Sequence, residues 1–139
     1  MWAKEKDSHG NTFYRHLKTN RITNDEPKEG PLVYHILIKH RDSRHPINDW
    51  TKEKARTFIS KILTVLIDQS RSIDTLEVFK NMAKKYSNCS SKKHDGCLEY
   101  FYINAMHKPF EDAVLKLTSG EMSDIVESVS GFHIIYRAQ

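Results

Sequence analysis

The sequence has little of what marks a secreted or membrane-spanning protein. It contains two cysteines in 139 residues, Cys89 and Cys97, whereas small secreted domains held by disulfides usually carry more. Its longest apolar stretch, around Ile62–Ile67, is far shorter than the ~20 residues of a membrane-spanning helix, and residues 1–7 hold no apolar segment of a secretory signal. We therefore expect a protein of the nucleus or cytoplasm without membrane association, although the sequence alone permits a Cys89–Cys97 disulfide.

The overall composition is that of an ordinary folded domain. Hydrophobic residues make up 38% and charged residues 29% of the chain, and the length fits one domain with at most a small appendage. The net charge of +4 and the pI near 9.0 favour anionic partners in general without identifying one. A nucleic-acid binder would show a recognition motif or an aromatic and basic platform, and the sequence shows neither. We expect a monomer that does not bind nucleic acid.

The first 27 residues are polar, with scattered aromatic side chains and two turn clusters. One cluster occupies residues 8–11 and the other is Thr19-Asn20. The pair Phe13-Tyr14 between them indicates a short strand in a small β-meander, which has little apolar content of its own. Residues 28–31 have the composition of a linker, so we expect the main domain to span residues 32–139.

The main domain combines apolar strands with amphipathic helices. Residues 32–39 form an apolar, β-branched run typical of a central strand, and a charged loop follows at residues 40–49. Apolar residues at spacings of three and four predict helices over residues 51–68 and 73–86. The later elements are a strand at 98–103, a helix at 109–117, a short strand at 125–126 and a final strand at 132–136. This order predicts an α+β domain with a small mixed or antiparallel sheet.

Three side chains are candidates for chemistry. His35 and His133 each lie within an apolar strand, and Cys89 lies in a loop rich in serine. A histidine in such a strand is more often a core residue than a catalyst, so neither is diagnostic alone. A thiol oxidoreductase would show a C-x-x-C pair, and a zinc site would usually show a paired C-x2-C, and both are absent. The zinc alternative would use Cys89, His94, Cys97 and His107.

Five short motifs make a functional role for His35, His133 and Cys89 more plausible. They are VYHILIKH at residues 33–40, YSNCSS at 86–91, KPFED at 108–112, SGEMS at 119–123 and SGFHIIYR at 130–137. In this order they resemble the parvulin family of peptidyl-prolyl cis/trans isomerases, and the resemblance covers the chain from about Leu32 to its end.

The N-terminal segment carries a second resemblance. Residues 1–27 are similar to a degenerate WW module, with Asn24 at the position of its second tryptophan. The framework residues in place are Trp2, Phe13-Tyr14, Thr19-Asn20 and Pro27. A WW module followed by a parvulin domain is the layout of the Pin-type parvulins, which act on phosphoSer-Pro and phosphoThr-Pro bonds.

The resemblance implies a non-covalent mechanism that needs no cofactor and no metal. The reaction breaks no covalent bond but crosses a rotation barrier of ~18–20 kcal/mol. A useful site holds the proline ring against apolar side chains and places polar groups around the turning carbonyl. By resemblance, the polar network consists of His35, Cys89, Ser130 and His133. The proline pocket consists of Leu98, Met106 and Phe110, with His107 and Ser128 beside it.

The charged loop after the first strand of the main domain bears on specificity. Pin-type enzymes bind the phosphate before proline through a lysine and an arginine pair in this loop. Lys39 and Arg44 match, His45 replaces the second arginine, and Arg41 is a plausible substitute for it. The resemblance therefore implies proline-containing, phosphorylated protein substrates.

Two departures from the family pattern argue against full isomerase activity. Glu99 stands where the family commonly has glycine, which puts a side chain and a negative charge where backbone freedom is used. Residues 100–105 are also bulkier than expected. Together with the degenerate WW module, the Glu99 change favours the alternative of a non-catalytic phosphopeptide-binding or scaffolding protein with decayed activity. We further expect the WW-like module to bind no phosphopeptide, because it lacks its second tryptophan. We also expect it to rest against the main domain, because the linker is only four residues long.

Overall fold

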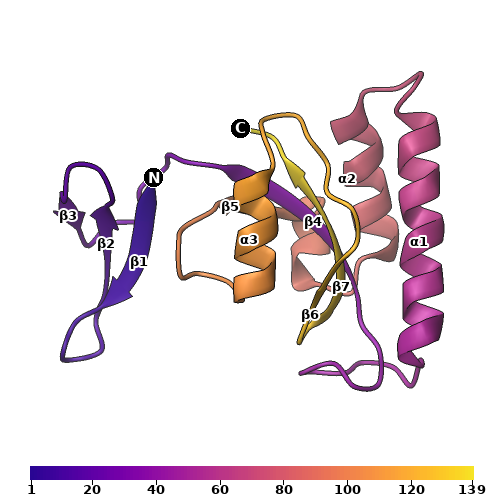
Figure 1. The fold of residues 1–139 in the computed structure, drawn as a ribbon, viewed down its shortest axis with the longest axis horizontal. Helices are drawn as coiled ribbons and strands as arrows, with labels where there is room; N and C mark the ends of the chain where they lie inside the picture. The colour runs from indigo at the N-terminus through magenta and orange to yellow at the C-terminus, as the bar shows by residue number, and fades with distance from the viewer.

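The computed structural model describes every residue from 1 to 139 and contains two antiparallel sheets and three α-helices (Figure 1). This is an α+β fold, as the sequence predicts. The first sheet has the strand order β1-β2-β3 and the second has the order β5-β4-β7-β6. No helix combines the length and apolarity that crossing a bilayer requires. The elements are β1 (Trp2–Lys6), β2 (Thr12–His16), β3 (Ile22–Thr23), β4 (Leu32–Ile38), α1 (Lys52–Gln69), α2 (Thr75–Tyr86), the 3-10 helix η1 (Ser90–His94), β5 (Cys97–Tyr100), α3 (Lys108–Lys116), β6 (Val126–Ser128) and β7 (Gly131–Arg137).

The N-terminal segment forms the predicted β-meander. The turn between β1 and β2 is closed by the carboxylate of Asp7, which accepts the backbone N–H groups of His9 and Asn11, both at 2.9 Å. Gly10 within this turn has a φ of 82°, a conformation that glycine adopts at little cost. The resulting register places Trp2 opposite His16.

The centre of the second sheet is the antiparallel pair β4 and β7. The pair runs from Val33 opposite Arg137 to Ile38 opposite Phe132. Helices α1 and α2 cover one face of the sheet and α3 covers the other (Figure 1). Because both faces are covered, the two strands are apolar almost throughout.

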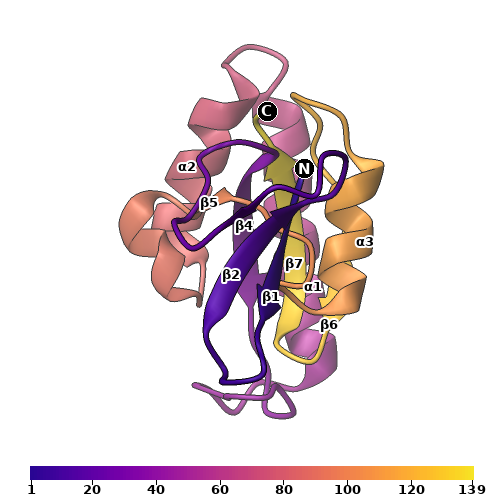
Figure 2. The same cartoon turned by 90° about the vertical axis from the view of Figure 1, so that its left-hand side faces the viewer.

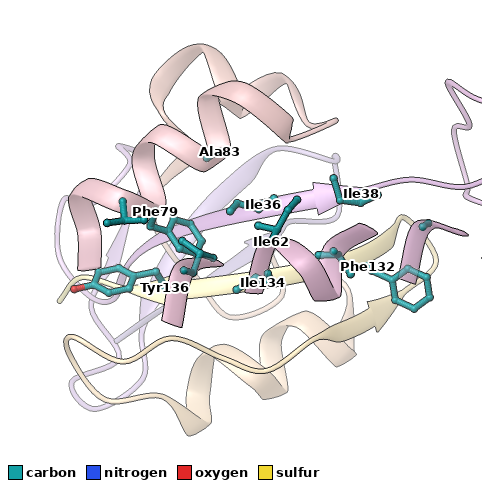
Figure 3. Packing of buried hydrophobic residues seen from close by; sticks show 12 residues of the cluster. Ile36, Ile38, Ile62, Phe79, Ala83, Phe132, Ile134 and Tyr136 are labelled. Atoms are coloured by element: carbon teal, nitrogen blue, oxygen red, sulfur yellow. The ribbon is translucent and has the colours of Figure 1, made fainter. Parts of the chain in front are cut away.

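The larger core cluster lies between the sheet and the helix pair α1 and α2 (Figure 3). Ile36 and Ile134 from the strands meet Ile62 from α1 and Phe79 from α2, and none of these side chains is more than 3% exposed. The amphipathic pattern of the sequence therefore predicts correctly which helix faces are buried. Thr51 caps the start of α1, with its hydroxyl accepting the backbone N–H of Lys54 at 3.0 Å.

The predicted helices end within two residues of their observed limits, but the strand predicted at 98–103 is wrong in its second half. In the structure β5 ends at Tyr100, and Ile103 instead forms a bridge with Ala3 of β1. The chain turns at Asn104, whose φ is 71°. Figure 2 shows the N-terminal sheet lying over this side of the main domain.

Candidate active site

The alternation of side chains along β4 and β7 decides where the two histidines lie. His35 pairs with Ile135 and Leu37 pairs with His133, so the two imidazoles are diagonal neighbours on the α3 face of the sheet. Phe110 of α3 packs edge-on against both rings, with centroid distances of 5.5 Å to His35 and 5.2 Å to His133. The two histidines are almost fully buried.

The two histidines share a hydrogen bond. The Nδ1 atoms of His35 and His133 are 3.2 Å apart, and such a bond requires a proton on one nitrogen only. Burial lowers the pKa of His133 to about 3, and the charges of His35 and His107 act in the same direction. His133 is therefore neutral at neutral pH, and one proton bridges the pair.

The network continues to the turn between β6 and β7. The Oγ of Ser128 lies 2.7 Å from Nε2 of His133, and the backbone N–H of Ser130 donates to the same Oγ at 3.1 Å. Ser130 thus joins the network through its backbone N–H. This contact fixes the Ser128 hydroxyl, which in turn orients His133.

Cys89 is held beside β4 by the two residues that precede it. The Ser87 hydroxyl accepts the backbone N–H groups of Leu37 at 3.1 Å and of Cys89 at 3.3 Å, and the backbone N–H of Asn88 donates to the Leu37 carbonyl at 2.7 Å. The loop is therefore bound to the strand that carries His35. Sequence reasoning did not single out Ser87, although it lies within the YSNCSS motif.

The environment of the Cys89 thiol favours its ionised form. Burial by itself raises the pKa of the thiol, but hydrogen bonding and the charge of His35, together with hydrogen bonds from Ser91, outweigh burial and lower the pKa from about 9 to about 6. Two buried side-chain atoms have no hydrogen-bond partner, namely Nε2 of His35 and Oγ of Ser91. They belong to the two residues whose influence lowers the pKa of the Cys89 thiol.

The three residues expected in the proline pocket come together. Phe110 is buried in a cluster that also contains Phe101, and Leu98 and Met106 are partly buried against this cluster. No hollow of the surface is lined by these three side chains. The largest hollow, about 380 Å³, lies elsewhere, beside Thr51 and Phe58 of α1. Leu98 and Met106 therefore present a small apolar surface next to the histidine pair, and the buried ring of Phe110 packs against both.

The basic loop reaches the same surface through Arg44. The backbone N–H of Arg44 donates to the Val129 carbonyl at 2.7 Å, which ties the loop to the turn between β6 and β7. Nη1 of Arg44 lies 3.5 Å from Nε2 of His107, the residue that precedes α3. Arg44 and His107 are therefore brought together beside the apolar surface.

The other basic residues of the loop have separate contacts. Nζ of Lys39 donates to the backbone carbonyl of His45 at 2.9 Å, so these two residues lie together. Arg41 is directed to the far end of the loop, where Nη2 donates to the Asp49 carbonyl at 3.3 Å. The structure thus groups Lys39 with His45 and Arg44 with His107, and places Arg41 apart from both pairs.

The residues of the zinc alternative do not assemble. No group of three or more histidine, cysteine, aspartate or glutamate side chains is arranged to hold a metal ion. Cys89 and Cys97 are both free thiols.

The glutamate at position 99, where the family commonly has glycine, has an unusual backbone conformation. Glu99 adopts a φ of 60°, the left-handed region that glycine enters without strain and other residues enter at a cost. This chain therefore carries an exposed glutamate in a backbone conformation that favours glycine.

An α+β domain that sets a buried histidine pair and an ionisable thiol beside an apolar surface fits an enzyme that acts on a peptide. Comparison with known proteins agrees with this class. Residues 35–139 match the family described as "Rotamase: PPIC-type PPIASE domain". The chain therefore belongs to the parvulin-type peptidyl-prolyl cis-trans isomerases.

Several relatives match along nearly the whole chain. It is 36% identical to the peptidyl-prolyl cis-trans isomerase ESS1 of Saccharomyces cerevisiae, an alignment that covers 99% of this chain and 78% of that protein. It is 38% identical to the putative peptidyl-prolyl cis-trans isomerase dodo of Drosophila melanogaster, covering 98% and 93%. Among solved structures, the peptidyl-prolyl isomerase ESS1 of Candida albicans superimposes with a TM-score of 0.70 at 26% identity, covering 99% of this chain and 94% of that one. The expectation of an isomerase is thus confirmed.

Proposed function

We propose that this isomerase prefers X-Pro bonds in which X is phosphoserine, phosphothreonine or an acidic residue. The observation that supports this preference is the position of Arg44, which lies 3.5 Å from His107 at the edge of the apolar surface. A proline ring on that surface leaves the preceding side chain within reach of the basic loop. An anionic side chain there gains a charge-assisted hydrogen bond that a neutral one does not.

The residues of the loop suit a phosphate. Arg44 offers a planar pair of donors and Lys39 adds a compact charge. Lys39 is at present bonded to a backbone carbonyl of its own loop, so its ammonium can exchange that neutral partner for a dianion. His45 lies beside Lys39, while Arg41 bonds to Asp49 at the other end of the loop. We therefore assign the phosphate contacts to Lys39 and Arg44.

The chemical step follows from the charge of the thiol. Resonance in the planar amide places negative charge on the carbonyl oxygen, and this charge diminishes as the C–N bond twists. A thiolate at Cys89 therefore repels the planar ground state more than the twisted transition state, which lowers the barrier. No bond to sulfur forms, because rotation needs no covalent adduct.

The histidine pair maintains that charge. The influence of His35 lowers the pKa of the thiol, and His133 and Ser128 fix the orientation of His35 through the Nδ1 contact. Phe110 closes the remaining side of both rings. The network thus keeps water away from the pair and favours the thiolate form of Cys89.

The test compares a phosphoSer-Pro peptide with the matching Ala-Pro peptide. Loss of charge-assisted hydrogen bonds worth about 1.5–3 kcal/mol predicts that the double variant Lys39→Ala/Arg44→Ala lowers kcat/KM on the phosphopeptide about 10- to 100-fold. The Ala-Pro peptide should change by less than about twofold. Lys61→Ala removes an exposed positive charge of α1, outside the loop, and is the matched control. Equal losses on both peptides would refute the phosphate assignment.

A further inference from the structure

The segment between β5 and α3, residues 101–107, connects the apolar surface to the N-terminal sheet. Met106 and His107 at its end border the apolar surface. Tyr102 and Ile103 in its middle contact the N-terminal sheet. Whatever holds the middle of this segment therefore also sets the position of Met106.

The aromatic contact with the N-terminal sheet is extensive for so small a module. Trp2 of β1, Tyr14 of β2 and Tyr102 form one buried cluster, and the rings of Tyr14 and Tyr102 lie 5.0 Å apart. The Tyr102 hydroxyl also donates to the backbone carbonyl of Pro27. The face of the sheet that carries Trp2 and Tyr14 is thus covered by the main domain.

The backbones of the two parts are also paired. The N–H of Ile103 donates to the Trp2 carbonyl at 3.1 Å, and the N–H of Lys4 donates to the Ile103 carbonyl at 2.9 Å. These bonds form a parallel bridge between Ala3 and Ile103. They fix the height of the segment relative to β1.

A buried carboxylate holds the segment from the opposite side. Glu111 of α3 is only 8% exposed, and its Oε1 accepts the backbone N–H of Asn104 at 2.7 Å. The N–H of Ala105 donates to the Tyr102 carbonyl at 3.1 Å, which completes a tight turn. Met106 therefore follows a turn that is anchored by β1 on one side and by α3 on the other.

We propose that the N-terminal sheet positions the proline-binding surface, with Trp2, Tyr102 and Glu111 as positioning residues that touch no substrate. This proposal rests on the proposed use of Met106 as a contact for proline. The sheet thereby contributes to substrate binding through the main domain, without binding a peptide itself. The bulky residues Tyr102 and Ile103 are the part of the main domain that receives it.

The test uses the full chain and two measurements, amide hydrogen exchange at the turn and KM. A residue that only stabilised the fold would not change both. Trp2→Ala and Glu111→Ala should each speed hydrogen exchange at the amides of Asn104 and Ala105 by about tenfold or more, because one anchor of the turn is lost. KM should rise about 3- to 10-fold while kcat changes by less than about twofold, the pattern expected when ground-state and transition-state binding weaken equally. Amide exchange within β7 should stay unchanged.

Two variants serve as matched controls. Glu111→Gln keeps an oxygen that can accept the Asn104 N–H and should restore most of both readouts. Phe13→Ala removes an aromatic ring from the opposite face of β2 and should change neither. If Trp2→Ala fails to fold, Tyr102→Phe removes only the hydroxyl bond to Pro27 and should shift exchange and KM in the same direction by about two- to threefold.

The outcomes separate this proposal from the proposed function. A fall in melting temperature for Trp2→Ala with unchanged exchange at Asn104 or unchanged KM would overturn the positioning role. If the unaltered protein isomerised none of the peptides, the proposed function would fail, and the dissociation constant of the phosphoSer-Pro peptide from an NMR titration would replace KM. An unchanged dissociation constant in Trp2→Ala would then overturn the positioning role as well.

Discussion

Replacing Glu99 by glycine should make the protein more stable. Glu99 has a φ of 60°, and the left-handed conformation costs a residue with a Cβ roughly 1–2 kcal/mol. Glycine removes this strain but adds freedom to the unfolded chain, which opposes folding by roughly 0.5–1 kcal/mol. The exposed glutamate side chain contributes no hydrogen bond that would be lost, and the bond from the Glu99 backbone N–H to Sγ of Cys97 is retained. The expected net gain is about 0.5–1 kcal/mol.

Urea denaturation of Glu99→Gly, Glu99→Ala and the unaltered protein measures this gain. Alanine removes the charge but keeps the Cβ, so Glu99→Ala should leave the free energy of unfolding within about 0.5 kcal/mol of the original. A gain of the same size in both variants would mean that charge repulsion, not the backbone, is the cause. A loss of stability in Glu99→Gly would refute the reasoning altogether. In isomerase assays the two variants should behave alike toward a phosphopeptide, because both remove the same negative charge.

The remaining predictions concern the thiol and one glycine. Cys89→Ala should lose much of the isomerase activity, whereas Cys89→Asp should keep a substantial part, because a carboxylate can replace the thiolate. A substrate covalently trapped on sulfur, or complete inactivity of a folded Asp variant, would contradict the non-covalent step. In a Cys97→Ser background, alkylation by iodoacetamide should follow the thiolate of Cys89, with a midpoint near pH 6 that moves to about 8.5 in urea. Since the pKa of Cys89 is lower in the folded state, the stability that its thiolate contributes is complete above about pH 9 and is lost as the pH falls through about 6; urea titrations across this range should show that sign. Gly131→Ala should destabilise the protein by more than about 2 kcal/mol, because its φ is 137° and an added Cβ would lie 2.5 Å from the Ile38 carbonyl oxygen; Gly120→Ala, which has a positive φ but open space around it, should cost only about 1 kcal/mol.

Local sequence patterns predict several features of the fold and the site. The spacing of apolar residues predicts α1 and α2 to within two residues, and the apolar runs locate β4 and β7. These predictions succeed because helix and strand periodicity depends on neighbours a few residues apart. The five motifs extend this reading to the family and to the enzyme class, which the match over residues 35–139 confirms.

The sequence does not show how distant groups meet. His35 and His133 are 98 residues apart, and only the register of β4 against β7 makes them diagonal neighbours on the face that Phe110 covers. The same holds for the thiol, since the pKa of Cys89 depends on its distance from His35 and on the surrounding burial. Serine, histidine and cysteine side chains occur in many structural environments. Their reactivity therefore depends on the groups that the folded chain places around them.

The error in β5 shows where local pattern fails. The run from Leu98 to Ile103 has the composition of a strand, and residues up to Tyr100 form one. Ile103, however, pairs with Ala3 across a separate sheet, and Tyr102 packs on Trp2 and Tyr14. The sequence by itself determined that this run favours an extended backbone, because β-branched and aromatic side chains favour strands. Only the tertiary structure decided which partner buries them, because the free energy of burial depends on the apolar area removed from water and not on where in the chain that area comes from.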